Sequence, residues 1–244
     1  MAEFLAWKAF FANGQSEKDR LPGNDSNNHD FTNAQQMEFT RLTNVESEDF
    51  EQAMDIYTSA FPINERQPED VVRERVNAGL SQIYVGRIEK DIVFMSLVWP
   101  LKHTDFMLLD YMATSAMQRG KNIGSLFLQH MGTLLARERK YFILEVEDPA
   151  YGDNKEERQK RISFYKKNGA KQLKDVTYIL PPLHGSVPTE MLLMIFPDYD
   201  NGRINASLVR DLIIQIYREL YNRDAKDTLL KNWPFDTQSW ITLV

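Results

Sequence analysis

"FMLLDYMATSAMQRGKNIGS", residues 106–125, is the stretch that decides the fold. It opens with a strand-like apolar run, residues 106–114, and leads into a helix predicted over about residues 121–139. The first N–H groups of a helix have no partner within the helix, and the helix dipole adds partial positive charge there. The basic residues and glycines at this junction therefore allow two interpretations. They are either helix punctuation or a cradle in which glycine lets a phosphate approach the backbone.

The glycine spacing excludes the two best-known phosphate loops. A Walker loop requires G-x-x-x-x-G-K-[ST], and the dinucleotide fingerprint requires G-x-G-x-x-G within a βαβ unit. Gly120 and Gly124 fit neither spacing, and no βαβ unit is predicted around them. A cradle here would have to be of another kind.

The rest of the chain, on either side of this stretch, predicts a mixed sheet. Periods of two and of 3.6 residues distinguish strands from helices, and Pro62, Pro68 and Gly169 mark helix ends. The expected order is strand, two helices, three strands, helix, strand, helix and two strands, followed by a C-terminal helix. In residue numbers this is 37–43, 44–61, 68–80, 81–89, 91–101, 106–114, 121–139, 141–147, 155–169, 176–182, 189–197 and 205–221. Adjacent strands in this order favour an antiparallel or mixed sheet over a doubly wound one.

These features resemble the GCN5-related N-acetyltransferase (GNAT) superfamily. The family pattern R/Q-x-x-G-x-G/A matches residues 119–124, with Asn122 in place of the first patterned glycine. Asn tolerates left-handed backbone angles better than most residues, so the loop can keep its shape. "FYKKNGA", residues 164–170, is similar to the family's FYxxxGF, with Ala170 as the departure. The order of elements matches the family from about residue 38 to 197.

The resemblance implies an α/β (α+β) fold and an acyl donor. The sheet would be mixed but mostly antiparallel, with six to seven strands, flanking helices and a splay between the fourth and fifth strands. Acetyl-CoA would bind in this splay, with its pantetheine arm along the backbone of Met112, Ala113 and Thr114. Its diphosphate would lie on the loop formed by Arg119, Gly120, Lys121, Asn122, Ile123, Gly124 and Ser125. Residues 112–114 could equally be an ordinary buried strand.

The resemblance also implies catalytic and substrate-binding residues. Tyr165 matches a tyrosine that would donate a proton to the departing thiolate, although a core tyrosine is the plain alternative. Asp110, expected on the same strand face as Met112, and Glu145 are candidates for the general base. Some relatives use only a water chain for this step, and acids such as these could also be a solvated strand edge. The candidates for acceptor binding are Glu65, Arg66 and Glu147, of which the first two lie in the loop between Pro62 and Pro68.

Composition narrows the function classes. The chain has 244 residues, a net charge of −6 and no cysteine. The acidic balance argues against nucleic-acid binding, and the missing cysteine excludes disulfides, thiolate metal sites and an acyl-cysteine intermediate. The histidines show no metal-ligand spacing, so no metal is expected. We also expect no membrane span, no secretory signal and a cytoplasmic location.

Three regions and three functions are predicted. Residues 1–36 would be an N-terminal extension with a short helix and a linker, 37–197 the acyltransferase domain, and 198–244 a helical extension packed on it. The first function is N-acetyl transfer by direct attack of a small-molecule or protein amine. The second is acyl-CoA sensing by a degenerate member, and the third is an interaction protein that uses its terminal helices. Apolar strands at the domain's end raise the prospect of a homodimer.

Overall fold

The computed structural model describes residues 37–152, 154–183, 187–199, 202–230 and 239–244. The predicted extension 1–36 falls outside these residues. The described part of the chain follows the predicted order, with additions near its C-terminal end. Its elements are β1 (Glu38–Leu42), α1 (Glu48–Ala60), α2 (Glu69–Asn77), β2 (Gln82–Ile88), β3 (Asp91–Pro100), β4 (Phe106–Thr114), the 3₁₀ turn η1 (Ala116–Gln118), α3 (Ile123–Glu138), β5 (Tyr141–Glu147), α4 (Lys155–Lys167), β6 (Lys171–Gln172), β7 (Tyr178–Leu180), β8 (Thr189–Phe196), β9 (Arg203–Asn205), α5 (Ala206–Tyr221), the 3₁₀ turn η3 (Thr228–Leu230) and β10 (Trp240–Thr242).

The sheet is mixed, as predicted. It has eight strands in the order β1-β2-β3-β4-β5-β8-β6, and β7 also pairs with β8. Every pairing in it is antiparallel except that of β4 with β5. The prediction of six to seven strands missed β6, because two residues cannot show an alternating pattern. It also missed the separate two-stranded sheet of β9 and β10, which flanks α5.

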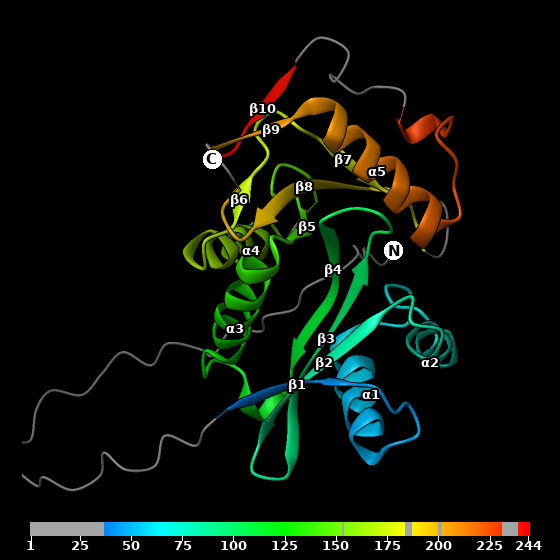
Figure 1. Ribbon diagram of the computed structural model, residues 1–244, viewed down its shortest axis with the longest axis vertical. Helices are drawn as coiled ribbons and strands as arrows, with labels where there is room; N and C mark the ends of the chain where they lie inside the picture. Colours follow the sequence, from blue (N-terminus) through cyan, green and yellow to red (C-terminus); the bar gives the residue numbers. More distant parts are fainter. Residues whose placement is uncertain (1–36, 153, 184–186, 200–201, 231–238) are drawn as a thin grey trace, which may run out of the picture.

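The helices cover both faces of the sheet. Alternate residues of β4 and β5 belong to different apolar clusters. Met107, Leu109, Phe142 and Leu144 pack with α3 and α4, whereas Phe106, Leu108 and Ile143 pack with α5. The helices α3 and α4 thus cover one face of the sheet. Helix α1 packs on the opposite face, against Tyr111 and Ala113 of β4. Figure 1 shows α3 and α4 on the left of the sheet and α1, α2 and α5 on its right.

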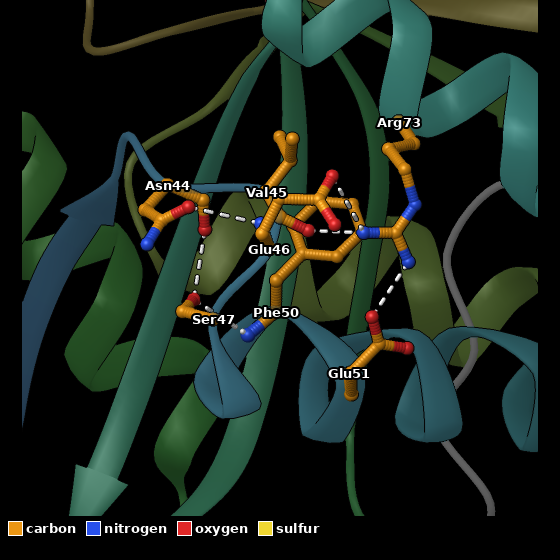
Figure 2. A network of polar contacts seen from close by, with 7 residues as sticks. All are labelled: Asn44, Val45, Glu46, Ser47, Phe50, Glu51 and Arg73. Atoms are coloured by element: carbon orange, nitrogen blue, oxygen red, sulfur yellow. Dashed lines mark hydrogen bonds and ion pairs between the residues drawn. The ribbon is translucent and has the colours of Figure 1, made fainter.

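The helix pair α1–α2 is fixed by local capping and by one arginine. Ser47 caps α1 by accepting a hydrogen bond from the Phe50 N–H at 3.3 Å. Arg73 of α2 reaches back to Glu51 at 2.6 Å and lies over the Phe50 ring, 4.6 Å from its centroid. Figure 2 shows this network, in which Arg73 also contacts the Val45 carbonyl. The loop between α1 and α2 is thereby held between two anchored helices.

The parallel pair of β4 and β5 is short. Only Phe106, Met107 and Leu108 of β4 pair with β5, opposite Tyr141, Phe142 and Ile143. Beyond these residues, no pairing between the two described strands is present, although β4 continues to Thr114 and β5 to Glu147. The predicted splay between the fourth and fifth strands is therefore confirmed, and it opens toward the carboxyl ends of both strands.

No described helix is both long enough and apolar enough to cross a bilayer. Within the same residues, no group of three or more histidine, aspartate or glutamate side chains is placed to hold a metal ion.

Candidate functional site

The junction between β4 and α3 adopts a backbone that few residues accept. Gly120 has φ of 79°, and Asn122, which precedes the first residue of α3, has φ of 63° and ψ of 14°. Asn is among the non-glycine residues that best tolerate this left-handed region. A Cβ at Gly120 would meet nothing within 4 Å, so its backbone faces open space. The substitution of Asn for the patterned glycine is thus compatible with the turn.

The amides of this junction are available to a ligand. In the described part of the chain, the N–H groups from Gly120 through Ser125 donate to no backbone or side-chain acceptor. The first hydrogen bond of the helix runs from the Leu126 N–H to the Asn122 carbonyl at 3.1 Å. The Asn122 side chain makes no capping bond, and the first turn holds no acidic residue. Helix punctuation alone would place a cap here, so the geometry favours an anion site.

A surface cavity of about 520 Å³ adjoins these amides. It lies between the start of α3 and the end of α4, and it is lined by Asn122, Ser125, Leu126, Gln129, Lys167, Asn168 and Gly169. Lys167 contributes the one basic side chain of this lining. A ligand with a phosphate on the α3 amides therefore has room to extend toward α4.

The backbone of β4 beside the splay is paired on one side. Met112, Ala113 and Thr114 pair with Ser96, Met95 and Phe94 of β3. Toward β5 they have no strand partner in the described chain, because that pairing ends at Leu108. An extended ligand between β4 and β5 could form hydrogen bonds with the backbone groups of this strand edge, as a neighbouring strand would. The predicted pantetheine contacts remain a prediction, and the backbone geometry is consistent with them.

Tyr165 lies on the face of the sheet that α3 and α4 cover. It is buried in the cluster that also contains Met112 of β4 and Leu144 and Val146 of β5. Burial raises the pKa of its phenol, and the positive charge of Arg161 acts in the opposite direction. The phenol therefore keeps its proton at neutral pH, which a general acid requires.

Asp110 marks the narrow end of the splay. Val98 pairs with Leu109 and Leu97 with Tyr111, so Asp110 is the extra residue of a β-bulge in β4. The expectation that it shares a face with Met112 is wrong, because the bulge breaks the alternation of side chains. Met112 packs with α3, whereas the Asp110 carboxylate raises the pKa of Tyr57 in α1 and of Tyr221 in α5.

Glu145 lies two residues beyond the last residue of β5 that pairs with β4. Asp110 likewise lies two residues beyond the last residue of β4 that pairs with β5. Its buried carboxylate accepts a hydrogen bond from the Tyr221 hydroxyl of α5 at 3.2 Å. Burial, Glu145 and Asp110 all raise the pKa of Tyr221, so both carboxylates lie near this phenol. Burial and Glu145 likewise raise the pKa of Tyr178. The structure thus brings the two predicted acids together across the splay.

Sequence reasoning missed the tyrosines around these acids. Tyr178 comes from β7 and Tyr221 from α5, and Tyr217 of α5 donates to the Ile179 carbonyl. Tyr217 and Tyr221 lie four residues apart, which places them on one helix face. Because their neighbours on that face are apolar, the sequence predicted a core-facing helix surface. No local pattern connects α5 with β5. The signal for this contact is tertiary and absent from the sequence.

The loop between α1 and α2 lies against β4 on the same face as Asp110. The Tyr111 hydroxyl donates to the Glu65 carbonyl at 3.2 Å, and the Tyr57 hydroxyl accepts from the Gln67 N–H at 2.9 Å. The Arg66 guanidinium lies 5.8 Å from the Tyr57 ring centroid. Glu65 is buried and Arg66 half-buried. The predicted acceptor residues Glu65 and Arg66 therefore lie close to the bulge.

Glu147 is placed differently from the other predicted acceptor residues. Its carboxylate is buried between Arg158 at 3.1 Å and Arg161 at 2.7 Å, both from α4. Burial raises the pKa of Glu147, and the two arginines act against that rise. A contact between Glu147 and the acceptor stays a prediction, but the carboxylate is already engaged by two cations.

Comparison with solved structures places this geometry in a known fold. A protein described as a GNAT-family acetyltransferase from Bacteroides thetaiotaomicron is 20% identical, with a TM-score of 0.65 over 77% of this chain and 99% of its own. A probable acetyltransferase from Staphylococcus epidermidis is 7% identical, with a TM-score of 0.52 over 67% of this chain and 100% of its own. An aminoglycoside 6′-N-acetyltransferase in complex with coenzyme A is 14% identical, with a TM-score of 0.50 over 66% and 99%. No protein-family model and no curated protein matches the sequence.

We predict that Ser125→Pro weakens coenzyme A binding about tenfold to a hundredfold, because a hydrogen bond to a charged group contributes ~1.5–3 kcal/mol. Proline is tolerated in the first helical turn, and this substitution removes one free N–H without breaking a helical hydrogen bond. Isothermal titration with coenzyme A measures the effect. Ser125→Ala is the matched control, since it keeps the N–H. Equal affinity of the two variants would contradict a role for this amide.

Proposed function

We propose that this chain, which has the GNAT fold, is an N-acetyltransferase that uses acetyl-CoA and a primary amine. The observation that carries the proposal is the row of amides from Gly120 through Ser125, which have no acceptor within the described residues and lie beside an open splay. Such amides at a helix start suit a diphosphate. The fold's relative with coenzyme A bound is consistent with this choice of donor.

The residues present fit such a donor. Gly120 leaves open space at the turn, and Arg119 and Lys121 add positive charge beside it. The edge of β4 after Leu108 can hold an extended arm, and Tyr165 lies on the same face as α3. Bound acetyl-CoA would supply the activated thioester. The chain's part is to hold it, exclude water and give a proton to the departing sulfur from Tyr165.

We assign the acceptor to the opposite face of the sheet. There Asp110 and Glu145 provide two buried carboxylates at the narrow end of the splay. Their negative charge would attract an ammonium group and could accept its proton, directly or through water. Glu65 and Arg66 are the neighbouring groups that could position the rest of the acceptor. We expect direct attack on the thioester, since the chain has no cysteine to carry the acyl group.

Two observations weaken the alternative functions. The sensor hypothesis rests on the departure at Asn122 and on the appended segments 1–36 and 198–244. The left-handed backbone of Asn122 is compatible with the turn. The interaction hypothesis used the N-terminal helix, which falls outside the described residues, and the C-terminal helix, which would need an exposed apolar face. Instead, Val209, Leu212 and Ile216 of α5 are buried against the sheet. The use of acetyl-CoA suits the cytoplasm, where we place the reaction. The proposed acceptor remains a small-molecule or protein amine.

We expect the chain to release free thiol from acetyl-CoA when an acceptor is present, and Tyr165→Phe to lower kcat about a hundredfold, as for a lost general acid. The assay is thiol release across a panel of polyamines, aminoglycosides, amino acids and peptides. Coenzyme A affinity, measured by titration, should be unchanged in Tyr165→Phe because the substitution removes only the hydroxyl. Coenzyme binding without thiol release on any amine would contradict the enzymatic proposal.

We predict that Asp110→Asn and Glu145→Gln each lower kcat/KM for a cationic amine roughly tenfold to a hundredfold, the effect of losing ~1.5–3 kcal/mol of interaction with a charge. Steady-state kinetics at fixed acetyl-CoA measure this. Glu138→Gln, the same change at an exposed position paired with Lys140, is the control and should behave as wild type. If both site variants match that control, the acceptor does not bind at these carboxylates.

A further inference from the structure

A buried charge cluster joins β5 to α4 on the edge of the splay. Glu147 of β5 contacts Arg158 at 3.1 Å and Arg161 at 2.7 Å, and all three side chains are almost fully buried. One carboxylate here faces two guanidinium groups. Replacing a buried ion pair with apolar groups is often neutral or stabilising, so such a cluster is weak evidence for a purely structural role.

The two arginines do different work. Arg158 holds the segment between β5 and α4: it donates to the Asn154 side chain at 2.6 Å and to the carbonyls of Asp148 and Tyr151. Arg158 also contacts Glu147 at 3.1 Å, which ties the start of α4 to β5. Arg161 is therefore the second cation on a carboxylate that already has one.

Arg161 lies one helical turn before Tyr165. Residues four apart on a helix share a face, and both side chains are buried. Burial raises the pKa of the Tyr165 phenol, and Arg161 is the charged group that lowers it. The charged and titratable groups that shift the pKa of Arg161 are Glu147, Tyr165, Arg158 and the exposed Glu157. Arg161 thus contacts the Glu147 carboxylate at 2.7 Å and shares a buried face of α4 with Tyr165.

We propose that Arg161, held by Glu147, is a positioning residue for the reaction: its guanidinium stabilises the phenolate that Tyr165 becomes when it protonates the departing thiolate. This inference rests on the proposed function. A phenolate forming in a buried site without a nearby cation would be strongly disfavoured, because a charge out of water needs a partner. Arg161 supplies that partner before the reaction begins.

In the acyl transfer, one proton moves to the sulfur and one leaves the nitrogen. The acceptor's nitrogen lone pair forms the N–C bond to the carbonyl carbon, and the C–S bond breaks with its electron pair on sulfur. The sulfur takes the Tyr165 proton, which leaves the phenolate beside Arg161. The nitrogen loses its extra proton to a carboxylate or to water, and the phenolate regains one from solvent. The products are the amide and free coenzyme A.

Glu147 has a distinct part in this arrangement. A buried guanidinium with no anion would turn away from the phenol or destabilise the fold. The 2.7 Å contact with Glu147 fixes one end of Arg161 on β5. Glu147, which was predicted to bind the acceptor, instead supports the proton transfer from Tyr165 by holding Arg161 in place.

The test is a titration that needs no acceptor. Difluorotyrosine, whose phenol is more acidic than that of tyrosine, is incorporated at position 165, and its ionisation is followed by absorbance. Arg161→Gln should raise its pKa by about one unit or more, the usual effect of losing an adjacent opposite charge. Arg161→Lys should stay close to wild type, and Arg137→Gln, on the surface of α3, should change nothing. An unchanged pKa in Arg161→Gln would overturn the proposal.

A second variant covers the case in which Arg161→Gln fails to fold. Arg161→Met leaves Glu147 and Arg158 as a balanced pair and replaces the buried stem with an apolar one, so it should fold. Its difluorotyrosine pKa should rise as well. No rise in a folded Arg161→Met protein would equally overturn the proposal.

A double-mutant cycle then separates this proposal from the proposed function. Arg161→Met should lower kcat about tenfold when residue 165 is tyrosine and leave it unchanged in a Tyr165→Phe background. Equal losses in both backgrounds would mean that Arg161 is only structural. Full activity of Tyr165→Phe itself would remove Tyr165 from the mechanism, whatever the titration of the phenol shows.

Discussion

The structure depends on one constraint, namely that two parallel strands stay together for only three residues. β4 and β5 pair at residues 106–108 and 141–143 and then separate. Here β3 holds β4 and β8 holds β5, so each strand remains in the sheet after the two part. The gap between them is therefore built by pairings on its outer sides.

The two faces of the sheet meet at this gap with different chemistry. On the face of α3 and α4 lie the junction amides, which have no acceptor among the described residues, the buried phenol of Tyr165, and the two arginines that contact Glu147. On the face of α1 and α5 lie Asp110 and Glu145, with tyrosines around them. An anionic donor and a cationic acceptor would each find complementary charge. This division supports transfer through the gap between two ligands that approach from opposite faces.

Local patterns in the sequence predicted most of this arrangement. Apolar periodicity and the helix ends marked by Pro62, Pro68 and Gly169 predicted the order of the elements. The basic, glycine-containing junction predicted an anion site, which stays a prediction. The bulge at Asp110 could not be predicted, because one extra residue in an apolar strand does not change the local sequence pattern. The partners of Glu145 and Glu147 could not be predicted either. Tyr221 is 76 residues from Glu145, and only the tertiary fold brings the two together.

The most direct test of this account is an amide spectrum of the isotopically labelled chain, titrated with coenzyme A and, separately, with pantetheine. The account predicts that coenzyme A shifts the backbone N–H resonances of residues 120–125, because its diphosphate becomes their acceptor. Pantetheine lacks the diphosphate and should leave these resonances in place. If coenzyme A bound while these resonances stayed unchanged, or if it did not bind, the central claim would be contradicted.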